Sequence, residues 1–110
     1  MCSFAACDRL TMKCSDLRNA YFNGIPLDRL LLMWPPRGGL PGEGTDKYAI
    51  ASNLPIYGTG DAGRRFYKAF RQKCLDVGLK ENEVMKSLYS YSVDGVVMAI
   101  LAVHVDDILY

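Results

Sequence analysis

Short apolar runs separated by glycine- and proline-rich segments divide this chain into small elements. The run at 28–33 ends at a pair of prolines, which predicts a buried strand rather than a helix. Similar runs at 11–15 and 47–54 predict two further strands. Residues 37–45 and 55–60 are rich in glycine and are predicted to be loops.

The strongest helical periodicity begins at Asp61 and ends near Gly78. Asp61 suits the N-cap position and Gly78 suits the C-terminal stop of a helix. One side of this predicted amphipathic helix is apolar and consists of Ala62, Phe66, Ala69, Phe70, Cys74 and Val77. The opposite side carries Arg64, Lys68 and Arg71. One or two further turns of helix are predicted at 3–10.

A hairpin is the strongest prediction for the last part of the chain. An Asp-Gly pair at 94–95 separates two β-favouring runs, 88–93 and 96–105, and this pair is typical of a tight hairpin turn. The second run is almost wholly apolar, so we expect a central strand that is covered on at least one face. Residues 108–110 are predicted to begin a return strand. The elements together indicate an α+β fold with an antiparallel sheet.

Composition and charge exclude several classes of protein. The chain has 110 residues, half of them apolar, and a formal net charge of +1, so one small folded domain is expected and disorder is not. The longest aliphatic run, 96–103, is far shorter than the roughly 20 residues of a membrane helix. The N-terminus lacks the features of a secretory signal. We therefore expect an intracellular protein with no membrane partner.

The four cysteines, Cys2, Cys7, Cys14 and Cys74, include no pair with the C-x-x-C spacing of a zinc site. We interpret them as free thiols in a reducing compartment, the cytoplasm or the nucleus. A disulfide framework is the alternative.

Two adjacent aspartates, Asp106 and Asp107, follow the most apolar predicted strand. One interpretation is a hairpin turn, because aspartate tolerates turn geometry. The other is a divalent-metal site, because Mg²⁺ is usually held by one or two carboxylates together with water and substrate phosphates. Asp16 also ends a short predicted strand, and two such strand ends on one rim of a sheet would hold two metal ions for phosphoryl transfer.

Several blocks of this sequence resemble copia-type LTR-retrotransposon reverse transcriptases. Residues 16–24, DLRNAYFNG, are similar to their D-V-x-N-A-F-L-N-G block, and residues 104–109, HVDDIL, are similar to their Y-V-D-D-I-x block. Three weaker matches lie between them in the same order: Pro35-Pro36 with Gly38 resembles P-P-G, 56–67 resembles L-Y-G-L-K-Q-A-P-R-A-W-Y, and 87–89 resembles S-L-F/Y. The resemblance covers about residues 10–110.

This resemblance implies an RNA-directed DNA polymerase, a nucleotidyltransferase of a transposable element, that uses two Mg²⁺ ions, with Mn²⁺ as the alternative ion. Asp16, Asp106 and Asp107 would be catalytic and metal-binding, with the backbone carbonyl of Leu17 as an extra ligand. Tyr21 would bind the incoming nucleotide and exclude a ribose 2′-hydroxyl; a core aromatic beside Phe22 is the alternative. The implied partners are an RNA or DNA template-primer, deoxynucleoside triphosphates and the remainder of a polyprotein.

Contacts with template and primer are implied for Tyr57, Gly58, Arg64, Lys68 and Arg71. The segment 61–80 carries six basic and two acidic side chains, which suits a phosphate backbone, although a solvated helix face explains the same residues. His104 replaces the tyrosine of the family block, and it is either structural or close to the primer end. Asp61 and Gly63 replace the family's glutamine and proline, and an acidic group near substrate phosphates is unfavourable.

The resemblance assigns residues 1–110 to a partial reverse transcriptase domain, a polymerase palm with part of the fingers, in which a catalytic hairpin packs on helices. The thumb, RNase H and integrase parts are absent. We expect Asp16 to lie near Asp106 and Asp107, and we expect no polymerisation by this chain alone because a three-residue return strand frays. A degenerate, non-enzymatic remnant with at most weak nucleic-acid binding and an unrelated two-metal nuclease are the alternatives.

Overall fold

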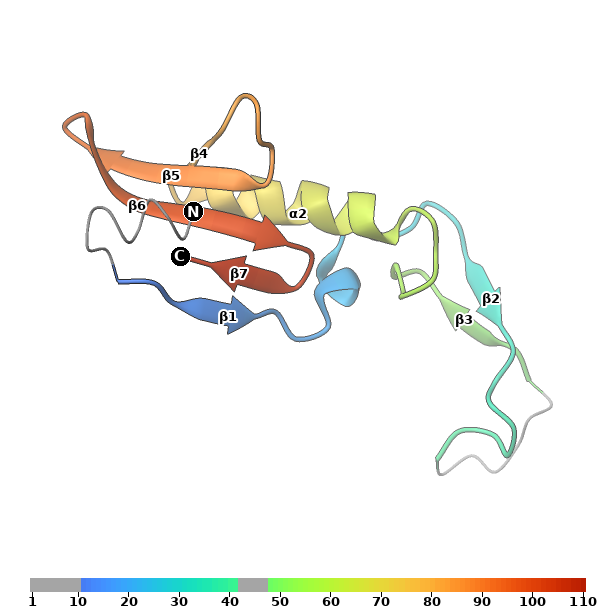
Figure 1. Ribbon diagram of the computed structural model, residues 1–110. Coiled ribbons are helices and arrows are strands. Elements are labelled where there is room, and N and C mark those ends of the chain that lie inside the picture. Colours follow the sequence, from blue (N-terminus) through green and yellow to red (C-terminus); the bar gives the residue numbers. More distant parts are fainter. Residues whose placement is uncertain (1–10, 42–47) are drawn as a thin grey trace.

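The computed structural model describes residues 11–41 and 48–110, and in these ranges it is a mixed α+β structure (Figure 1). The predicted helix at 3–10, together with Cys2 and Cys7, lies outside the described residues. Seven strands form two antiparallel sheets, one of five strands and one of two. The α+β prediction is therefore confirmed.

The five-stranded sheet has the order β1-β7-β6-β5-β4, and all its neighbours are antiparallel. Its strands are β1 (Cys14–Asp16), β4 (Lys80–Glu81), β5 (Leu88–Val93), β6 (Val96–His104) and β7 (Asp107–Leu109). Asp94 and Gly95 both have positive φ, 50° and 81°, as the tight turn between β5 and β6 requires. The predicted hairpin is confirmed.

The return strand β7 is better held than the sequence suggested. β7 pairs with β6 on one edge and with β1 on the other, so it is an inner strand of the sheet. Two backbone hydrogen bonds between Lys13 and Tyr110, of 2.6 and 2.9 Å, extend the β1–β7 ladder to the last residue of the chain. The expectation that residues 108–110 make few ladder hydrogen bonds is wrong, because a second strand from far upstream in the sequence pairs with their outer edge.

Helix α2 (Ala62–Asp76) packs on one face of this sheet through aromatic rings. Phe66 is buried, the ring of Phe70 lies 5.7 Å from it, and Phe70 in turn lies 6.3 Å from the buried ring of Tyr89 on β5. The helix ends as predicted, with Gly78 at a φ of 87°. Val77, the last residue of the predicted apolar stripe, is exposed because it lies beyond the last helical turn.

A short 3₁₀ helix, η1 (Ala20–Asn23), is held against the first turn of α2. Gly24 follows η1 and is buried at the point of closest approach. A Cβ atom at Gly24 would lie 2.9 Å from the backbone nitrogen of Phe66 and 3.0 Å from the Pro55 ring. Only glycine allows this approach, so the end of the 16–24 block is fixed by packing.

The second sheet contains β2 (Leu31–Met33) and β3 (Ile50–Ser52) and extends away from the first (Figure 1). The molecule measures 59 × 26 × 21 Å along its principal axes. The strand predicted at 28–33 is confirmed for Leu31–Met33 only, and the prediction that it is buried is wrong. Leu32 is 65% exposed, because among the described residues no helix or sheet packs on that face of the hairpin.

Strand β6 is central in the sheet, as predicted. Only the residues in its second half are partly buried. Val96, Val97 and Met98 are exposed, whereas Leu101 and Val103 are half-buried. The β5–β6 turn reaches past the end of α2 in Figure 1, so the helix covers only part of the strand. The prediction that this strand is covered on at least one face is therefore wrong for its first half.

Candidate functional site

The register of three strands brings the two predicted acidic segments together. Asp16 on β1 lies directly opposite Asp107 on β7, and Asp107 lies directly opposite His104 on β6. Residues paired in this way project from the same face of a sheet, with neighbouring Cα atoms about 4.5–5.5 Å apart. Asp16, Asp107 and His104 therefore form a row across the sheet, which we call the acidic row.

The acidic row lies on the sheet face that points away from α2. Tyr89, which packs against the helix through Phe70, pairs with Leu101, so Leu101 and the alternate residue Val103 face the helix. His104 has the opposite orientation along the same strand. All three residues of the row are exposed, and a hollow lined by Cys14, Ala102, Leu109 and parts of the row lies beside them.

Asp106 occupies the turn between β6 and β7, where Val105 has a positive φ of 54°. A positive φ is rare for a β-branched residue, so this turn is strained. The backbone N–H of Leu17 donates a 2.7 Å hydrogen bond to the carbonyl of Asp106. This bond ties the residue that follows Asp16 directly to the turn, and it places Leu17, whose carbonyl is the predicted extra ligand, next to Asp106.

The donor chemistry of the acidic row fits Mg²⁺. Two carboxylates side by side, open to solvent, correspond to the one or two carboxylates with which proteins usually hold this ion, water and phosphate oxygens supplying the other ligands. Within 11–41 and 48–110, however, no three acidic, histidine or cysteine side chains are gathered closely enough to enclose an ion by themselves. Asp16 and Asp107 are thus the residues placed to share a metal, and Asp106 lies beside them in the turn.

Tyr21 and Tyr57 form an aromatic pair near the β6–β7 turn. Their ring centroids are 4.3 Å apart, and Tyr21 also lies 6.4 Å from Phe66. Tyr21 is half-buried and Tyr57 is 53% exposed, so the pair has one anchored ring and one open ring. Gly58, which follows Tyr57, is exposed and has a φ of 94°. The structure therefore joins the 16–24 block to the 56–67 block at these two rings.

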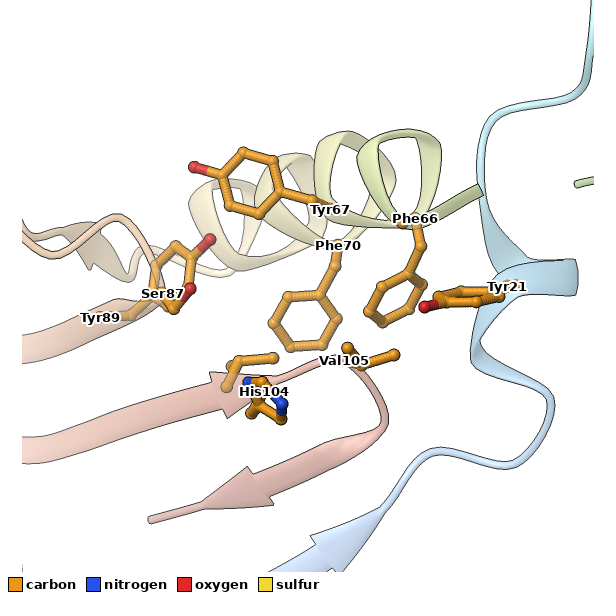
Figure 2. A pocket seen from close by; sticks show the side chains of 10 residues that line it. Tyr21, Phe66, Tyr67, Phe70, Ser87, Tyr89, His104 and Val105 are labelled. Carbon is orange, nitrogen blue, oxygen red and sulfur yellow. The ribbon is translucent and has the colours of Figure 1, made fainter. Parts of the chain in front are cut away.

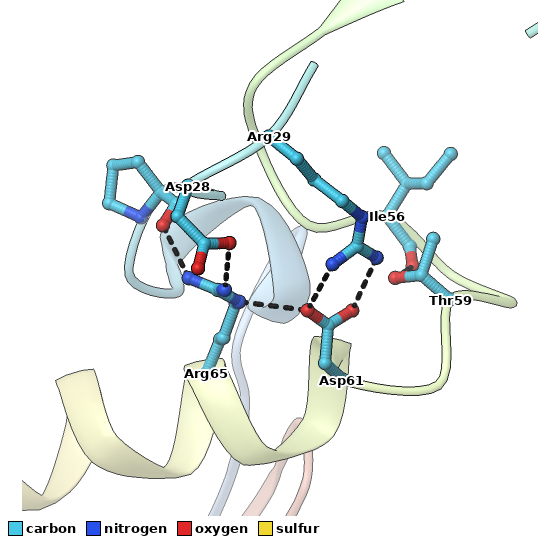
Figure 3. A network of polar contacts seen from close by, with 7 residues as sticks. Asp28, Arg29, Ile56, Thr59, Asp61 and Arg65 are labelled. Atoms are coloured by element: carbon cyan, nitrogen blue, oxygen red, sulfur yellow. Dashed lines mark hydrogen bonds and ion pairs between the residues drawn. The ribbon is translucent and has the colours of Figure 1, made fainter. Parts of the chain in front are cut away.

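Asp61 does not cap α2 as the sequence predicted. It stands at the N-cap position, but its side chain makes no capping hydrogen bond. Instead its carboxylate accepts hydrogen bonds from Arg29, at 3.1 and 3.3 Å, and from Arg65, at 3.0 Å (Figure 3). The hydrogen bond from Arg29 has the largest effect on the pKa of Asp61, and the bond from Arg65 the next largest. Both hold this pKa below its ordinary value of 3.8. Arg29 and Arg65 thus neutralise the negative charge of Asp61, the acidic group that is unfavourable near substrate phosphates.

Arg65 extends this network to the segment before β2. It bonds Asp28 at 2.7 Å and the carbonyl of Pro26 at 2.6 Å, while its Nε atom holds Asp61 (Figure 3). We call the set Asp28, Arg29, Asp61 and Arg65 the arginine clamp. It connects the first turn of α2 to the base of the β2–β3 hairpin.

The predicted basic residues of α2 separate into two kinds. Arg64 and Lys68 are exposed, but Arg71 donates a 2.9 Å hydrogen bond to Glu81 on β4, whose side chain is 8% exposed. Tyr67 donates a hydrogen bond to the same carboxylate, and this bond and Arg71 hold the pKa of Glu81 below its ordinary value. Because α2 covers the sheet face opposite the acidic row, Arg64 and Lys68 are not brought to the same surface as Asp16 and Asp107.

No protein-family model matches this chain, and neither the curated proteins nor the solved structures yielded a match. In the part of the chain that the structure describes, no helix combines the length and the apolar character needed to cross a bilayer. Cys14 and Cys74, the two cysteines among the described residues, are both free thiols.

Several residues of these networks were missed in the sequence, among them Arg65 and Arg29. Arg65 stands four residues after Asp61, a spacing that favours an ion pair on a helix, so a signal for it was present. His104 was named in the sequence, but its position opposite Asp107 follows from the two-residue turn at 105–106 that the structure shows. Arg29 had no local signal, since its contact with Asp61 depends on how two distant segments meet.

Proposed function

We propose that this chain is the palm part of a copia-type reverse transcriptase, an RNA-directed DNA polymerase. The observation that carries the proposal is the register that sets Asp16 opposite Asp107, next to Asp106 in the turn. These aspartates come from the two sequence blocks that resemble the family's metal-binding blocks. A register that places Asp16 beside Asp107 on neighbouring strands is what a shared metal site would require.

The proposed reaction is the attack of a primer 3′-hydroxyl on the α-phosphorus of a deoxynucleoside triphosphate, with release of pyrophosphate. Mg²⁺, when bound, would activate the hydroxyl and neutralise charge on the phosphates. Asp16 and Asp107 would hold the ion on the exposed face of the sheet, where a template-primer duplex has access. The inner position of β7 keeps Asp107 in place, which matters because about 1 Å of misplacement costs roughly a hundredfold in rate.

Tyr21 and Tyr57 lie on the helix side of the sheet and the acidic row lies on the other side, so the two rings would border an incoming nucleotide only where it passes the β6–β7 turn. Their rings lie where η1, the start of α2 and the β6–β7 turn meet, and Tyr57 is open enough to contact a base or sugar. Arg64 and Lys68 would contact nucleic acid only if it wraps around the edge of the sheet. Arg71 is engaged with Glu81, so we no longer include it among the proposed template contacts.

The proposal is tested by primer extension on an RNA template with four deoxynucleotides and Mg²⁺, first with this chain and then with a chain lengthened into the surrounding reading frame. Asp16→Asn should lower extension by more than about a hundredfold, because even residues that only orient metal ligands are worth about 10–100-fold. Asp94→Asn is the matched control, since it makes the same change in the β5–β6 turn, at the end of β6 away from the acidic row.

Extension that survives Asp16→Asn would overturn the assignment of the metal site. No extension by either chain would favour the degenerate remnant. Cleavage of the template without synthesis would favour the two-metal nuclease.

A separate prediction concerns Tyr21. Tyr21→Ala should raise the incorporation of ribonucleotides relative to deoxynucleotides, because it removes the ring proposed to exclude the 2′-hydroxyl. The measurement is competitive incorporation of the two nucleotide types opposite one template base. Tyr91→Ala, which truncates an exposed tyrosine on β5, is the control and should leave this ratio unchanged. Equal ratios in the Tyr21→Ala variant and the wild type would show that Tyr21 is a structural aromatic.

A further inference from the structure

His104 is the one residue of the acidic row to which the proposed function gives no role. It ends β6, where the aromatic pocket beneath α2 and the hollow beside the row both reach it. Figure 2 shows it at the end of the strand, close to Val105. Val103 faces the helix, so the alternation of the strand directs the His104 side chain to the face that carries Asp16 and Asp107.

His104 and Asp107 form one cross-strand pair next to the tight β6–β7 turn. Such pairs have Cβ atoms about 4.5–5.5 Å apart on the same face of the sheet. Two ligand atoms on a tetrahedral Zn²⁺ ion lie about 3.4 Å from each other, since Zn–N and Zn–O bonds are close to 2.1 Å. An imidazole nitrogen and a carboxylate oxygen on these neighbouring strands can therefore reach the same ion.

The Asp107 carboxylate forms no ion pair in the described part of the chain, where the acids of the ion pairs are Asp28, Asp61 and Glu81. Asp107 and His104 are both exposed, so an ion can approach them from solvent. Strand β7 lies between β1 and β6, which holds the backbone of Asp107 from both sides. The pair is thus accessible and positioned by a paired sheet.

The donor types of this pair select the class of ion. Mg²⁺ takes oxygen ligands, whereas imidazole suits borderline transition-metal ions such as Zn²⁺ and Ni²⁺. An imidazole beside a carboxylate therefore favours a transition-metal ion over Mg²⁺. Two protein ligands leave the other positions of the ion to water, in agreement with the lack of a closed three-ligand cluster within 11–41 and 48–110.

We propose that His104 and Asp107 chelate a transition-metal ion of the Zn²⁺ class across the β6–β7 hairpin. Asp16, on the other side of Asp107, is the next carboxylate in the register. The ion would use a carboxylate that is also proposed to hold Mg²⁺, so Zn²⁺ and Mg²⁺ would compete for it. Zn²⁺ binding itself does not depend on the proposed polymerase function, because it stands on the pairing and the donor types of two residues.

The imidazole nitrogens of His104 report this binding directly, because His104 is the only histidine in the chain. The ¹⁵N-labelled 110-residue chain is titrated with Zn²⁺ and, separately, with Mg²⁺, and long-range ¹H–¹⁵N NMR spectra record the imidazole signals. Zn²⁺ should shift one imidazole nitrogen saturably, whereas Mg²⁺ alone should not. Zn²⁺ bound only by cysteine thiols would leave both nitrogens unshifted and would overturn the proposal.

Three variants test the second ligand. Asp107→Asn should raise the Kd for Zn²⁺ at His104 by at least about tenfold, because even groups that only orient a metal ligand are worth about 10–100-fold in affinity. Asp107→Glu keeps a carboxylate and should retain saturable binding. Asp94→Asn is the matched control in the β5–β6 turn, far from the pair along β6, and should leave the Kd unchanged.

An unchanged Kd in Asp107→Asn, loss of binding in Asp107→Glu or an equal imidazole shift with Mg²⁺ would each overturn the chelate. Primer extension does not enter this readout, so failure of the chelate and failure of the polymerase proposal are distinguishable.

Discussion

The five-stranded sheet and the β2–β3 hairpin are both built from apolar strands, yet their environments differ. The sheet has α2 on one face, and Tyr89 in its β5 strand is buried to 1% exposure. The hairpin has no such layer in the described chain, and Leu30, Leu32 and Trp34 along it are 64%, 65% and 81% exposed. Similar apolar runs therefore became strands in both regions, but only one region acquired a core.

The two regions also differ in what holds them. Helix α2 joins the sheet through tilted and edge-on aromatic rings and the Arg71–Glu81 pair, whereas it joins the base of the hairpin through the arginine clamp. Apolar contacts are insensitive to pH, and exposed ion pairs contribute little and are screened by salt. The sheet should therefore be the stable region and the hairpin the region that opens first.

The largest expected difference between the two regions is in the loss of stability when one apolar side chain of each is truncated to alanine. Phe66→Ala should lower the free energy of unfolding by about 3–5 kcal/mol, because it leaves a cavity in a small core. Leu32→Ala should change it by less than about 0.5 kcal/mol, as expected at an exposed position. Denaturant unfolding monitored by circular dichroism measures both. Comparable losses would mean that the hairpin face is covered in solution.

An intermediate effect is expected from the arginine clamp. Because the pKa of Asp61 is lowered in the folded chain, its contribution to stability is complete above its ordinary pKa of 3.8 and is lost as the pH falls through the lowered value. Asp61→Asn should remove this contribution, so the variant should lose less stability than the wild type between pH 6 and pH 3. The measurement is the denaturation midpoint as a function of pH.

Amide hydrogen exchange shows where the clamp acts. At neutral pH, Asp61→Asn should speed exchange in β3 and leave β5 and β6 protected, because the clamp connects α2 to the hairpin and not to the sheet. Asp76→Asn is the matched control, since Asp76 is an exposed aspartate at the other end of the same helix. Faster exchange throughout the chain in Asp61→Asn would show that the two regions unfold as one unit.

The smallest expected effect distinguishes two arginines of α2. Arg71→Ala should lower the denaturation midpoint, because it leaves the largely covered carboxylate of Glu81 with one partner fewer, and exchange should rise in β4. Arg64→Ala should leave both unchanged, since Arg64 is exposed. Equal midpoints for the two variants would mean that the Glu81 contact contributes nothing measurable.

The sequence by itself determined the elements whose signals are local. The Asp-Gly pair sets the β5–β6 turn because its backbone angles suit that turn, and the periodicity of 61–78 with Gly78 sets α2 and its end. An unbroken apolar run stopped by two prolines likewise predicted the strand at 28–33, of which Leu31–Met33 form β2. Each of these signals lies within a few residues, so no knowledge of distant contacts was needed.

Only the tertiary structure decided which strands are covered, which charges are paired and which carboxylates meet. Burial of an apolar strand depends on a second layer, and α2 reaches β5 and part of β6 but not the hairpin. The sequence predicts that Asp61 caps the helix. In the structure, Arg29 from another segment lies 3.1 Å from the Asp61 carboxylate and competes for it with the backbone N–H groups of the helix. The pairing of Asp16 with Asp107 depends on β1 adding to the far edge of β7, a register that strands at opposite ends of the described chain acquire only when they share a sheet.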